Sequence, residues 1–429
     1  MLPSGLVIAD DLTGATDTGH EFAARGLRTL VSASTVPSEN PRAETDVRVV
    51  DTDSRYADPS SAAAAVLDVV AAGDHSFVYK KVDSTLRGNL VGETDAVLDA
   101  TAADLAVVAP ASPRNGRTTV EGYHLVDGTP VAETAAGNDP DKPVETSHLP
   151  TRYSASSYPV SRLPVNRVAT GPSAVADALR EQARTGRGIV VADASHERHL
   201  EAIADGAARS GLSVVYVGSA GLARYVETPP PRGAGPASVP TRDRTVLCVV
   251  GSTNPATLDQ LDALPAESVV SLDLGGAVEN PASASADAAA ACSERLADRD
   301  AAVLVSAPDE AAPRRALDAG RRLGIDDQTV RARVAETLGS TVERLWAGGS
   351  PTPESMFVTG GAVAADVFES LDADGVVLSG TAVEEGIPLG RLSGGAADGV
   401  PVVTKAGAFG TPGAIRKCIA RLGGDDEYE

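Results

Sequence analysis

The chain has 429 residues, with 37 Lys and Arg against 59 Asp and Glu, which gives a net charge of −22. A surface this acidic repels polyanions, so nucleic acid is excluded as a partner. No apolar run approaches the roughly 18 residues of a membrane span, and the first residues lack the basic start and apolar stretch of a signal peptide. We therefore expect a soluble, cytoplasmic protein with no membrane partner, built of two or three domains.

The acidic balance comes with very little lysine. Five of the 37 basic residues are Lys, and 3% of all residues are aromatic. This composition fits a halophilic protein, because carboxylates hold water in a cytosol whose Debye length falls to roughly 3 Å near 1 M salt. The alternative is an acidic protein from a GC-rich genome. Cys248, Cys292 and Cys418 lie far apart without a Cys-x-x-Cys pair, so neither a disulfide framework nor a zinc site is expected.

Short apolar runs alternate with Ala-rich amphipathic stretches in the first half of the chain. The runs are too short for helices and mostly lack polar alternation, which is typical of parallel strands buried on both faces. They lie at Leu6–Ala9, Thr29–Ser32, Val47–Val50, Phe77–Lys80, Ala106–Ala109, Ile189–Ala192 and Val214–Val217. Between them the pattern predicts helices that each end before a Gly. These helices are Asp17–Arg25, Ser60–Ala72, Ser173–Thr185 and Glu197–Ser210.

A stretch rich in Pro and Gly then interrupts the alternation. Residues 229–240 have the composition of a linker. A second series of predicted strands follows at Val246–Val250, Val269–Leu272, Ala302–Val305, Met356–Thr359, Val376–Leu378 and Val402–Thr404. The sequence therefore predicts an α/β fold of two domains, 1–228 and 241–429, each a mostly parallel sheet flanked by helices. Long loops are expected at about 110–165.

Polar residues that directly follow a strand are the candidates for a site, because ligands bind beyond the carboxyl ends of parallel strands. Asp10 and Asp11 follow the first run, and two adjacent carboxylates destabilise a fold unless a cation or hydrogen-bond donors meet them. Thr13 and Gly14 would supply a tight turn before the helix. The alternative is that Asp11 or Thr13 caps the helix while Asp10 is solvated.

After the fourth run, two of the scarce lysines stand side by side. Neighbouring side chains of an extended segment point to opposite faces, so we expect only one of Lys80 and Lys81 to reach a given pocket. Asp83 shares a face with Lys81, and together with Ser84 it can cap the next helix. Arg87 offers a planar fork suited to a carboxylate or a phosphate. An ordinary helix cap with exposed basic residues is the alternative.

Three strand–glycine–helix turns in the second half could hold phosphate through backbone N–H groups. They are Gly251–Thr257, Thr359–Val363 and Thr404–Gly410. Any one of them can be a structural turn, but three together suggest a nucleotide or phosphate site. There is no Walker A loop, no Gly-x-Gly-x-x-Gly fingerprint and no Gly-x-Ser-x-Gly elbow. His196 and His199 could share a metal, but a solvated surface is expected there.

Taken in order, these segments resemble the four-carbon acid sugar kinase family, the kinases of threonate, erythronate and 3-oxo-tetronate. The matching segments are Asp10–Ala15, Lys80–Gly88, Gly116–Thr119, Gly122–His124, Asp139–Pro140, Gly218–Ala223, Gly251–Ser252, Gly360–Gly361, Gly386–Gly390 and Lys405–Gly410. They extend over almost the whole chain, and the first two are the most specific. The resemblance implies an N-terminal domain that binds the sugar acid and a C-terminal domain that binds ATP. Mg²⁺ would bridge the phosphates and needs few protein ligands.

The resemblance also implies roles for individual residues. Those facing the substrate would be Asp10, Asp11, Lys81, Asp83, Ser84 and Arg87. The general base would be Asp10 or Asp83, between which the sequence does not choose. Those facing the nucleotide would be Ser252, Gly360, Gly361, Ala362, Val363 and Gly407. Ala362-Val363 replaces the Glu-Thr that the family usually has, which keeps the backbone N–H groups and removes any side-chain contact.

The first hypothesis is thus an ATP-dependent kinase that phosphorylates the terminal hydroxyl of a four-carbon sugar acid. Phosphoryl transfer needs positioning, charge neutralisation and a carboxylate for the attacking hydroxyl, which these residues offer. The second is a sugar-acid- or nucleotide-binding sensor of the same fold that has lost turnover, and Ala362-Val363 favours it. A dehydrogenase is disfavoured by the missing glycine fingerprint. The oligomeric state stays open, with a homodimer among the options.

Overall fold

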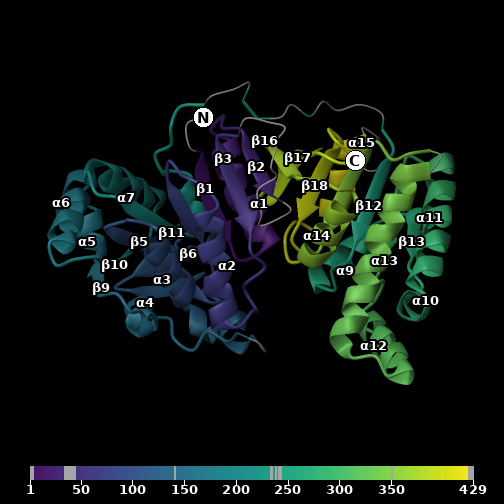
Figure 1. The fold of residues 1–429 in the computed structure, drawn as a ribbon, viewed down its shortest axis with the longest axis horizontal. Coiled ribbons are helices and arrows are strands. Elements are labelled where there is room, and N and C mark those ends of the chain that lie inside the picture. The colour runs from purple at the N-terminus through teal and green to yellow at the C-terminus, as the bar shows by residue number, and fades with distance from the viewer. Residues whose placement is uncertain are drawn as a thin grey trace. The chain divides into compact units, whose positions relative to one another are not determined.

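Figure 1 presents the computed structural model of the chain, which describes residues 4–32, 45–139, 142–231, 235–236, 239, 244–348 and 351–423. The chain forms two compact units, each with most of its residue contacts within itself. The N-terminal unit comprises Met1–Glu39 and Glu44–Gly235, and the C-terminal unit comprises Asn40–Ala43 and Pro236–Glu429. Half of the predicted linker 229–240 lies outside the described residues.

The N-terminal unit is built on a sheet of parallel strands in the order β2-β3-β1-β4-β11-β5-β10-β9. The strands are β1 (Gly5–Ala9), β2 (Thr29–Ser32), β3 (Val47–Asp51), β4 (Val78–Lys81), β5 (Leu105–Ala109), β9 (Val160–Leu163), β10 (Gly188–Ala192) and β11 (Val214–Gly218). Every residue of β1, β5 and β10 is buried, which explains why these strands read as continuous apolar runs.

The longer helices of this unit are α1 (Leu12–Ala23), α2 (Pro59–Ala71), α3 (Leu90–Ala100), α6 (Pro172–Ala183) and α7 (Glu197–Arg209). One hydrophobic core lies between sheet and helices, and includes Ile8 of β1, Val66 of α2, Val97 of α3 and Val108 of β5. The predicted helices are confirmed, but α1 begins five residues before the predicted Asp17 because Asp11 caps it. The first polar residues after β1 therefore lie on a helix terminus.

The prediction of long loops at about 110–165 was wrong in part. This stretch forms a small antiparallel sheet of β6 (Arg117–Val120), β7 (Tyr123–Val126) and β8 (Thr129–Pro130), followed by the short helix α4 (Leu149–Arg152). Two-residue turns join its strands, and both turn residues have positive φ at Glu121-Gly122 and at Asp127-Gly128. An Xaa-Gly pair of this kind fits the type I′ hairpin turn, so a signal was present in the sequence.

The C-terminal unit carries a second sheet, in the order β13-β14-β12-β15-β18-β17-β16. Its strands are β12 (Val246–Val250), β13 (Val269–Ser271), β14 (Ala301–Val305), β15 (Ser355–Thr359), β16 (Gly375–Glu384), β17 (Ile387–Ser393) and β18 (Pro401–Lys405). The first five strands in that order pair in parallel, whereas β17 pairs antiparallel with both β16 and β18. The predicted fold class, α/β with mostly parallel sheets, is confirmed.

Helices follow these strands, and a second core lies among them. They are α9 (Pro255–Leu261), α10 (Leu274–Glu279), α11 (Pro281–Asp298), α12 (Ala312–Leu323), α13 (Asp327–Gly348), α14 (Gly361–Ser370) and α15 (Ala414–Gly423). The core includes Cys248, Phe357, Ile415 and Cys418. Buried apolar contact accounts for the placement of the cysteines, which are free thiols in β12, α11 and α15.

The two sheets share one strand order. In each unit the chain leaves the first strand (β1 or β12), forms the edge strand, returns to the position between them, and then crosses to the other side of the first strand. The order reverses between β1 and β4 in one unit and between β12 and β15 in the other. Ligands of such sheets bind at this switch point, beyond the carboxyl ends of the strands.

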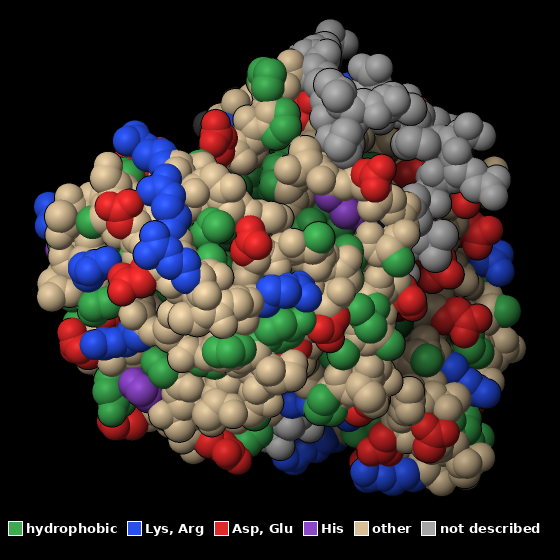
Figure 2. All heavy atoms as spheres, turned by 60° about the vertical axis from the view of Figure 1, so that its left-hand side comes forward, with side chains coloured by type: hydrophobic (Ala, Val, Ile, Leu, Met, Phe, Trp, Pro, Cys, Tyr) green, Lys and Arg blue, Asp and Glu red, His purple; other side chains and the backbone are tan. Residues whose placement is uncertain are grey.

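The surface agrees with the composition. Figure 2 shows acidic, basic and hydrophobic side chains interspersed on one face of the molecule. Several exposed arginines pair with a neighbouring acid, as Arg180 does with Asp177 and Arg209 with Asp205. Within the described residues no helix has both the length and the apolar character to cross a membrane.

Candidate active site

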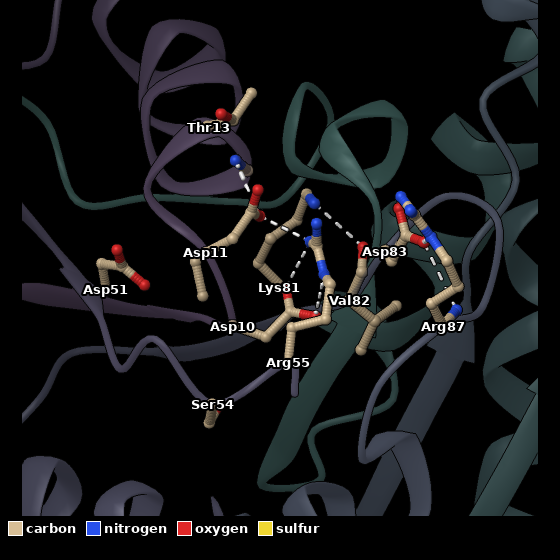
Figure 3. A network of polar contacts seen from close by, with 12 residues as sticks. Asp10, Asp11, Thr13, Asp51, Ser54, Arg55, Lys81, Val82, Asp83 and Arg87 are labelled. Atoms are coloured by element: carbon tan, nitrogen blue, oxygen red, sulfur yellow. Dashed lines mark hydrogen bonds and ion pairs between the residues drawn. The ribbon is translucent and has the colours of Figure 1, made fainter. Parts of the chain in front are cut away.

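The first crevice lies at the switch point of the N-terminal sheet. Asp10 follows β1 and accepts two hydrogen bonds of 2.9 Å from Arg55, Nε to Oδ2 and Nη2 to Oδ1. The same Nη2 lies 2.5 Å from Oδ1 of Asp11. Figure 3 shows both carboxylates turned toward this guanidinium. Arg55 is therefore the cation that offsets the repulsion between the two adjacent carboxylates.

Each Asp has its own second role. Asp10 is 2% exposed, so the alternative of a solvated Asp10 is wrong. Asp11 is the N-cap of α1, and its Oδ1 accepts a 3.0 Å hydrogen bond from the Gly14 amide. A Cβ on Gly14 would lie 2.5 Å from Oδ1 of Asp11 and 2.7 Å from Nζ of Lys81. The absence of a side chain at Gly14 thus lets the Asp11 carboxylate and the Lys81 ammonium approach each other beside the helix.

The charges of this crevice set its titration. Burial would raise the pKa of Asp10, but Arg55, with help from Lys80 and Lys81, holds that pKa below its ordinary value. Asp51, at the end of β3 and beside Asp11 in Figure 3, behaves differently. Burial raises the pKa of Asp51 to about 7, and the charge of Asp11 adds to the rise. The crevice therefore combines a carboxylate that is ionised at neutral pH with a carboxyl group whose pKa is about 7.

Arg55 is a residue of this site that no sequence pattern predicted. The residue stands in the loop after β3, so the rule that polar residues follow a strand applied to it as well. It was not selected because Arg is abundant in this chain and only Lys is rare enough to attract attention. Its amide also bonds to the carbonyl of Asp10, at 3.2 Å, which fixes the loop to the end of β1.

The two neighbouring lysines of β4 have different surroundings. Lys80 is fully buried, and its Nζ lies 3.1 Å from Oε2 of Glu93 on α3. Ser54 donates to the other oxygen of Glu93. Lys81 instead places its Nζ beside Gly14 and donates to the carbonyl of Val82 at 2.9 Å. Of the two lysines, Lys81 is the one that reaches the crevice with Asp10 and Asp11 (Figure 3).

The segment after Lys81 forms a tight turn. The Leu86 amide bonds to the Asp83 carbonyl at 2.9 Å, and Leu86 has a φ of 64°, which is rare for a residue with a side chain. The prediction that Asp83 and Ser84 cap the next helix was wrong, because α3 begins later with Asn89 as its N-cap. Such a strained turn persists only where its surroundings hold it, and functional sites often contain one.

Asp83 and Arg87 face each other across this turn. Oδ2 of Asp83 accepts from Nε of Arg87 at 2.7 Å and from the Thr85 hydroxyl at 2.5 Å. Burial would raise the pKa of Asp83, but Arg55 and Arg87 lower it well below its ordinary range. Arg87 is 29% exposed and also lies 3.6 Å from Asp139. Arg87 therefore keeps part of its fork accessible while Asp83 stays ionised.

A buried histidine fixes the same turn from behind. Nε2 of His124, on β7, donates to the carbonyl of Ser84 at 2.9 Å, and its Nδ1 lies 2.9 Å from the hydroxyl of Thr119 on β6. Because the carbonyl can only accept, Nε2 carries a proton, and in the neutral ring the Thr119 hydroxyl donates to Nδ1. Burial lowers the pKa of His124 to about 4, which keeps it neutral at physiological pH. The small sheet thus supports the turn that follows Lys81.

The second crevice lies at the switch point of the C-terminal sheet and is formed by small residues. A Cβ on Gly360, which has a φ of 104°, would lie 3.4 Å from the amide nitrogen of Ser252. A Cβ on Gly407 would lie 2.3 Å from Oγ of Ser252. The loops after β12, β15 and β18 therefore meet here, and Gly361 opens α14 with its first amides. This is the arrangement that binds phosphate through backbone N–H groups.

Lys405 supports this crevice from within the protein. Its Nζ donates to the carbonyls of Ala406, Gly407 and Phe409 at 2.9, 3.1 and 3.3 Å. Burial lowers the pKa of Lys405 to about 8. Lys405 is 3% exposed, and its hydrogen bonds hold the loop that carries Gly407.

The departure at positions 362 and 363 has a packing consequence. Val363 is 8% exposed, and a Cβ on Gly251 would lie 2.2 Å from its Cγ2, so the two loops are in contact here. The side chain of Ala362 lies outside what the structure describes. Val363 therefore fills space between the turns and adds no polar group to the crevice.

The paired histidines lie at the start of α7. The rings of His196 and His199 are 5.4 Å apart, and His199 is 3% exposed, so the expectation of a solvated surface was wrong for His199. It packs on the buried side of the amphipathic helix α7. The described residues contain no group of three His, Cys, Asp or Glu side chains that could hold a metal ion.

Comparison with known proteins agrees with the two-unit architecture. A family model described as a sugar-binding N-terminal domain matches residues 5–226, and one described as a nucleotide-binding C-terminal domain matches residues 247–415. Two solved structures, from Salmonella typhimurium LT2 and Haemophilus influenzae, have the same fold with TM-scores of 0.77 and 0.74. They are 23% and 24% identical to this chain, cover 97% of it, and are themselves covered to 98% and 100%.

Curated relatives align over nearly the full length. D-threonate kinase of Salmonella typhimurium is 33% identical, over 96% of both chains. D-erythronate kinase of Heliobacterium modesticaldum is 34% identical, over 97% of this chain and 96% of its own. 3-oxo-tetronate kinase of Brucella melitensis is 29% identical, over 94% and 92%. The chain therefore belongs to the four-carbon acid sugar kinase family.

Proposed function

We propose that this protein is an ATP-dependent kinase that phosphorylates the terminal (4-) hydroxyl of a four-carbon sugar acid such as threonate, erythronate or 3-oxo-tetronate. The names of its full-length relatives support this activity. The observation that carries the proposal is the cluster in which Asp10 and Asp11 share Arg55 beside Lys81, at the switch point of the N-terminal sheet. Taking charges out of water costs stability, and clusters of this kind gather at functional sites.

We assign the carboxylate of the sugar acid to Arg87. Its side chain is 29% exposed, whereas that of Arg55 is 12% exposed and already binds two carboxylates. Asp10 and Asp83 stay ionised because arginines lower their pKa values, so each can accept a hydrogen bond from the attacking hydroxyl. A weak base suffices in a phosphoryl transfer with a loose transition state, where positioning matters more than proton abstraction.

The remaining substrate contacts follow from what each group can offer. Lys81 would bring its ammonium to the transferred phosphoryl group, since it is the lysine next to Asp11 in this crevice. Asp11 and Ser84 would bind other hydroxyls of the acid. Asp11 also belongs to the first turn of α1, so its carboxylate is oriented before any substrate arrives.

ATP is assigned to the C-terminal unit, domain 241–429 of the sequence prediction. The amides from Gly360 to Val363 at the start of α14, together with Ser252 and Gly407, form a cradle that suits phosphates. Mg²⁺, when bound, neutralises phosphate charge. The described residues offer no three-ligand protein cage for it, which suits an ion that is held by phosphates and water.

The alternative of a sensor without turnover rests on Ala362-Val363 alone. A cradle of backbone amides does not depend on the side chains at these positions, and the charged cluster of the N-terminal unit is complete. The kinase is therefore preferred.

The deciding experiment is ADP release with ATP and Mg²⁺ in molar KCl, using a panel of threonate, erythronate and 3-oxo-tetronate stereoisomers. We expect turnover with one acid, and loss of that turnover in Asp83→Asn, in which the arginines lose their carboxylate partner. If the folded protein binds ATP but releases no ADP with any acid of the panel, the sensor would be favoured.

Three further expectations from the sequence stay predictions: a cytoplasmic location, a halophilic protein and a homodimer. A halophilic protein should unfold at a higher temperature as KCl rises from 0.1 M to the molar range, because concentrated salt screens the repulsion within a chain of net charge −22. Light scattering on the eluted protein would give the oligomeric state.

A further inference from the structure

One aromatic ring of the C-terminal unit is exposed without an apparent structural need. In the described part of this unit the aromatic residues are Trp346, Phe357, Phe368 and Phe409. Phe357 and Phe368 are buried in the cores, whereas Phe409 is 38% exposed. It is also the one exposed Phe among all described residues. A single exposed apolar side chain is common on protein surfaces, so the meaning of this ring depends on what lies beside it.

The ring of Phe409 packs against a glycine, and hydrogen bonds hold its backbone carbonyl. Gly386, in the turn between β16 and β17, has a φ of 76°, and a Cβ there would lie 2.3 Å from the ring of Phe409. The Phe409 carbonyl accepts from Nζ of Lys405 at 3.3 Å and from Nε2 of Gln260 at 3.1 Å. Both donors are buried. The ring therefore lies against a glycine turn on a loop that three separate elements fix.

This loop also borders the phosphate cradle. Gly407, two residues before Phe409, lies against Oγ of Ser252. Gly410 and Thr411, which follow Phe409, line an open pocket of about 520 Å³ with Glu384, Glu385 and Lys417. Thr411 and Lys417 both bond to Glu384, which places fixed donors and acceptors around that pocket. One short loop thus runs from the cradle past an exposed ring to an open pocket that Glu384 and Lys417 help to line.

We propose that the ring of Phe409 is the platform on which the base of the nucleoside triphosphate stacks. Every nucleobase has a π-face, and stacking on an aromatic side chain is a common way to bind it. With the phosphates at Gly360 and Gly407, the base would lie along the loop toward Phe409, and the groups around Glu384 would face its polar edge. The inference rests on the proposed function, since it places the base of the same nucleotide.

The test separates the base from the phosphates. Isothermal titration calorimetry would measure ATP and inorganic tripolyphosphate, which lacks the base, on the wild-type protein and on Phe409→Ala. We expect ATP to bind at least about tenfold more weakly to the variant, because stacking contributes about that much per base. Tripolyphosphate should bind both proteins within about twofold.

Two further variants keep the test decisive. Phe409→Leu preserves an apolar contact with Gly386 and should show most of the same loss for ATP, while its unfolding temperature stays near that of the wild type. Phe409→Trp should retain ATP binding. Its fluorescence should be quenched by ATP but not by tripolyphosphate, and this quenching should exceed that of the wild type, in which Trp346 is the single tryptophan. Leu323→Ala, which removes another exposed apolar side chain, is the matched control and should change neither affinity.

Equal loss of ATP and tripolyphosphate affinity in Phe409→Ala, or no loss of either, would overturn the inference and leave the kinase intact. A wild-type protein that turns over the acid but binds tripolyphosphate as tightly as ATP would overturn it too. A folded wild-type protein that binds no ATP would contradict the proposed function itself, and the base platform with it.

Discussion

The two crevices occupy the same topological position in their sheets, but one is formed by charged side chains and the other by glycines and backbone amides. In the N-terminal unit, charged side chains converge: Asp11 and Arg55, both partly buried, meet the buried Asp10. In the C-terminal unit, glycines bring three loops together, as at Gly360 and Gly407. A sugar acid carries one carboxylate and several hydroxyls that need directed partners, whereas phosphates can be held by rows of backbone amides. The comparison implies that removing a side chain damages the first site and adding one damages the second.

The largest effect should come from removing Arg55. In Arg55→Ala, Asp10 and Asp11 would lose their shared cation while Asp10 stays buried, which costs several kcal/mol for a broken buried pair. We expect kcat/KM for the sugar acid to fall by about 1,000-fold. The Kd for ATP, measured by calorimetry, should stay within about twofold because the cradle lies in the other unit.

Arg209→Ala is the control for this prediction, since Arg209 pairs with Asp205 at the surface and such pairs contribute little. It should retain full activity. If Arg55→Ala weakened ATP binding as strongly as it lowered turnover, the two sites would not be independent and the comparison would fail.

The second prediction concerns the support behind the charged site. Between pH 6.5 and about 4 the unfolded chain binds a proton at His124 that the folded chain does not, because burial lowers its folded pKa to about 4. The free energy of unfolding should therefore fall as pH falls through this window, by up to about 3 kcal/mol. In His124→Gln, which can still donate to Ser84 and accept from Thr119, this part of the pH dependence should disappear.

Urea unfolding at pH 7 and pH 5 would check this for both proteins. The difference between the two pH values should be smaller in His124→Gln than in the wild type. Equal differences would mean that His124 is protonated in the folded state and that the turn at Ser84 does not depend on a neutral ring.

Much of the fold could be predicted because its parallel strands are buried on both faces. Runs such as Leu6–Ala9 and Val246–Val250 are apolar throughout, and both are strands. The strand β9 was missed because Val160–Leu163 contains Ser and Arg, and three of its four residues are only partly buried. The strand β17 was missed because Pro and Gly within Ile387–Ser393 suggest a turn.

The candidate site was predictable to the extent that its residues directly follow strands. Asp10 and Lys81 stand at strand ends, and the rarity of Lys drew attention to Lys81. Arg55 stands four residues beyond β3, where only the tertiary fold brings it to Asp10. The contact of Gly407 with Ser252 could not be predicted either, because these residues follow β18 and β12, which β15 separates in the sheet.

The third prediction addresses the backbone site. Gly407→Ala would place a Cβ 2.3 Å from Oγ of Ser252, so the loop or the serine must move. We expect the Kd for ATP to rise by about 30-fold, because phosphate contacts depend on the position of the backbone. The Kd for the sugar acid, measured without nucleotide, should not change.

Gly413→Ala is the matched control in the same segment, since a Cβ there would meet nothing within 4 Å. It should bind ATP like the wild type. A Gly407→Ala protein with wild-type ATP affinity would show that the cradle is formed elsewhere.

The smallest effect should come from the position at which the chain departs from its family. Val363→Thr keeps the shape that packs against Gly251 and restores a hydroxyl. If the amides alone hold the phosphates, KM for ATP and kcat should each change by less than about threefold, since no catalytic group is gained. A rise of tenfold or more in kcat would instead mean that a side chain at 363 contributes to the reaction and that this chain has lost it. The two sites would then resemble each other more than their present residues suggest, because both would depend on side chains.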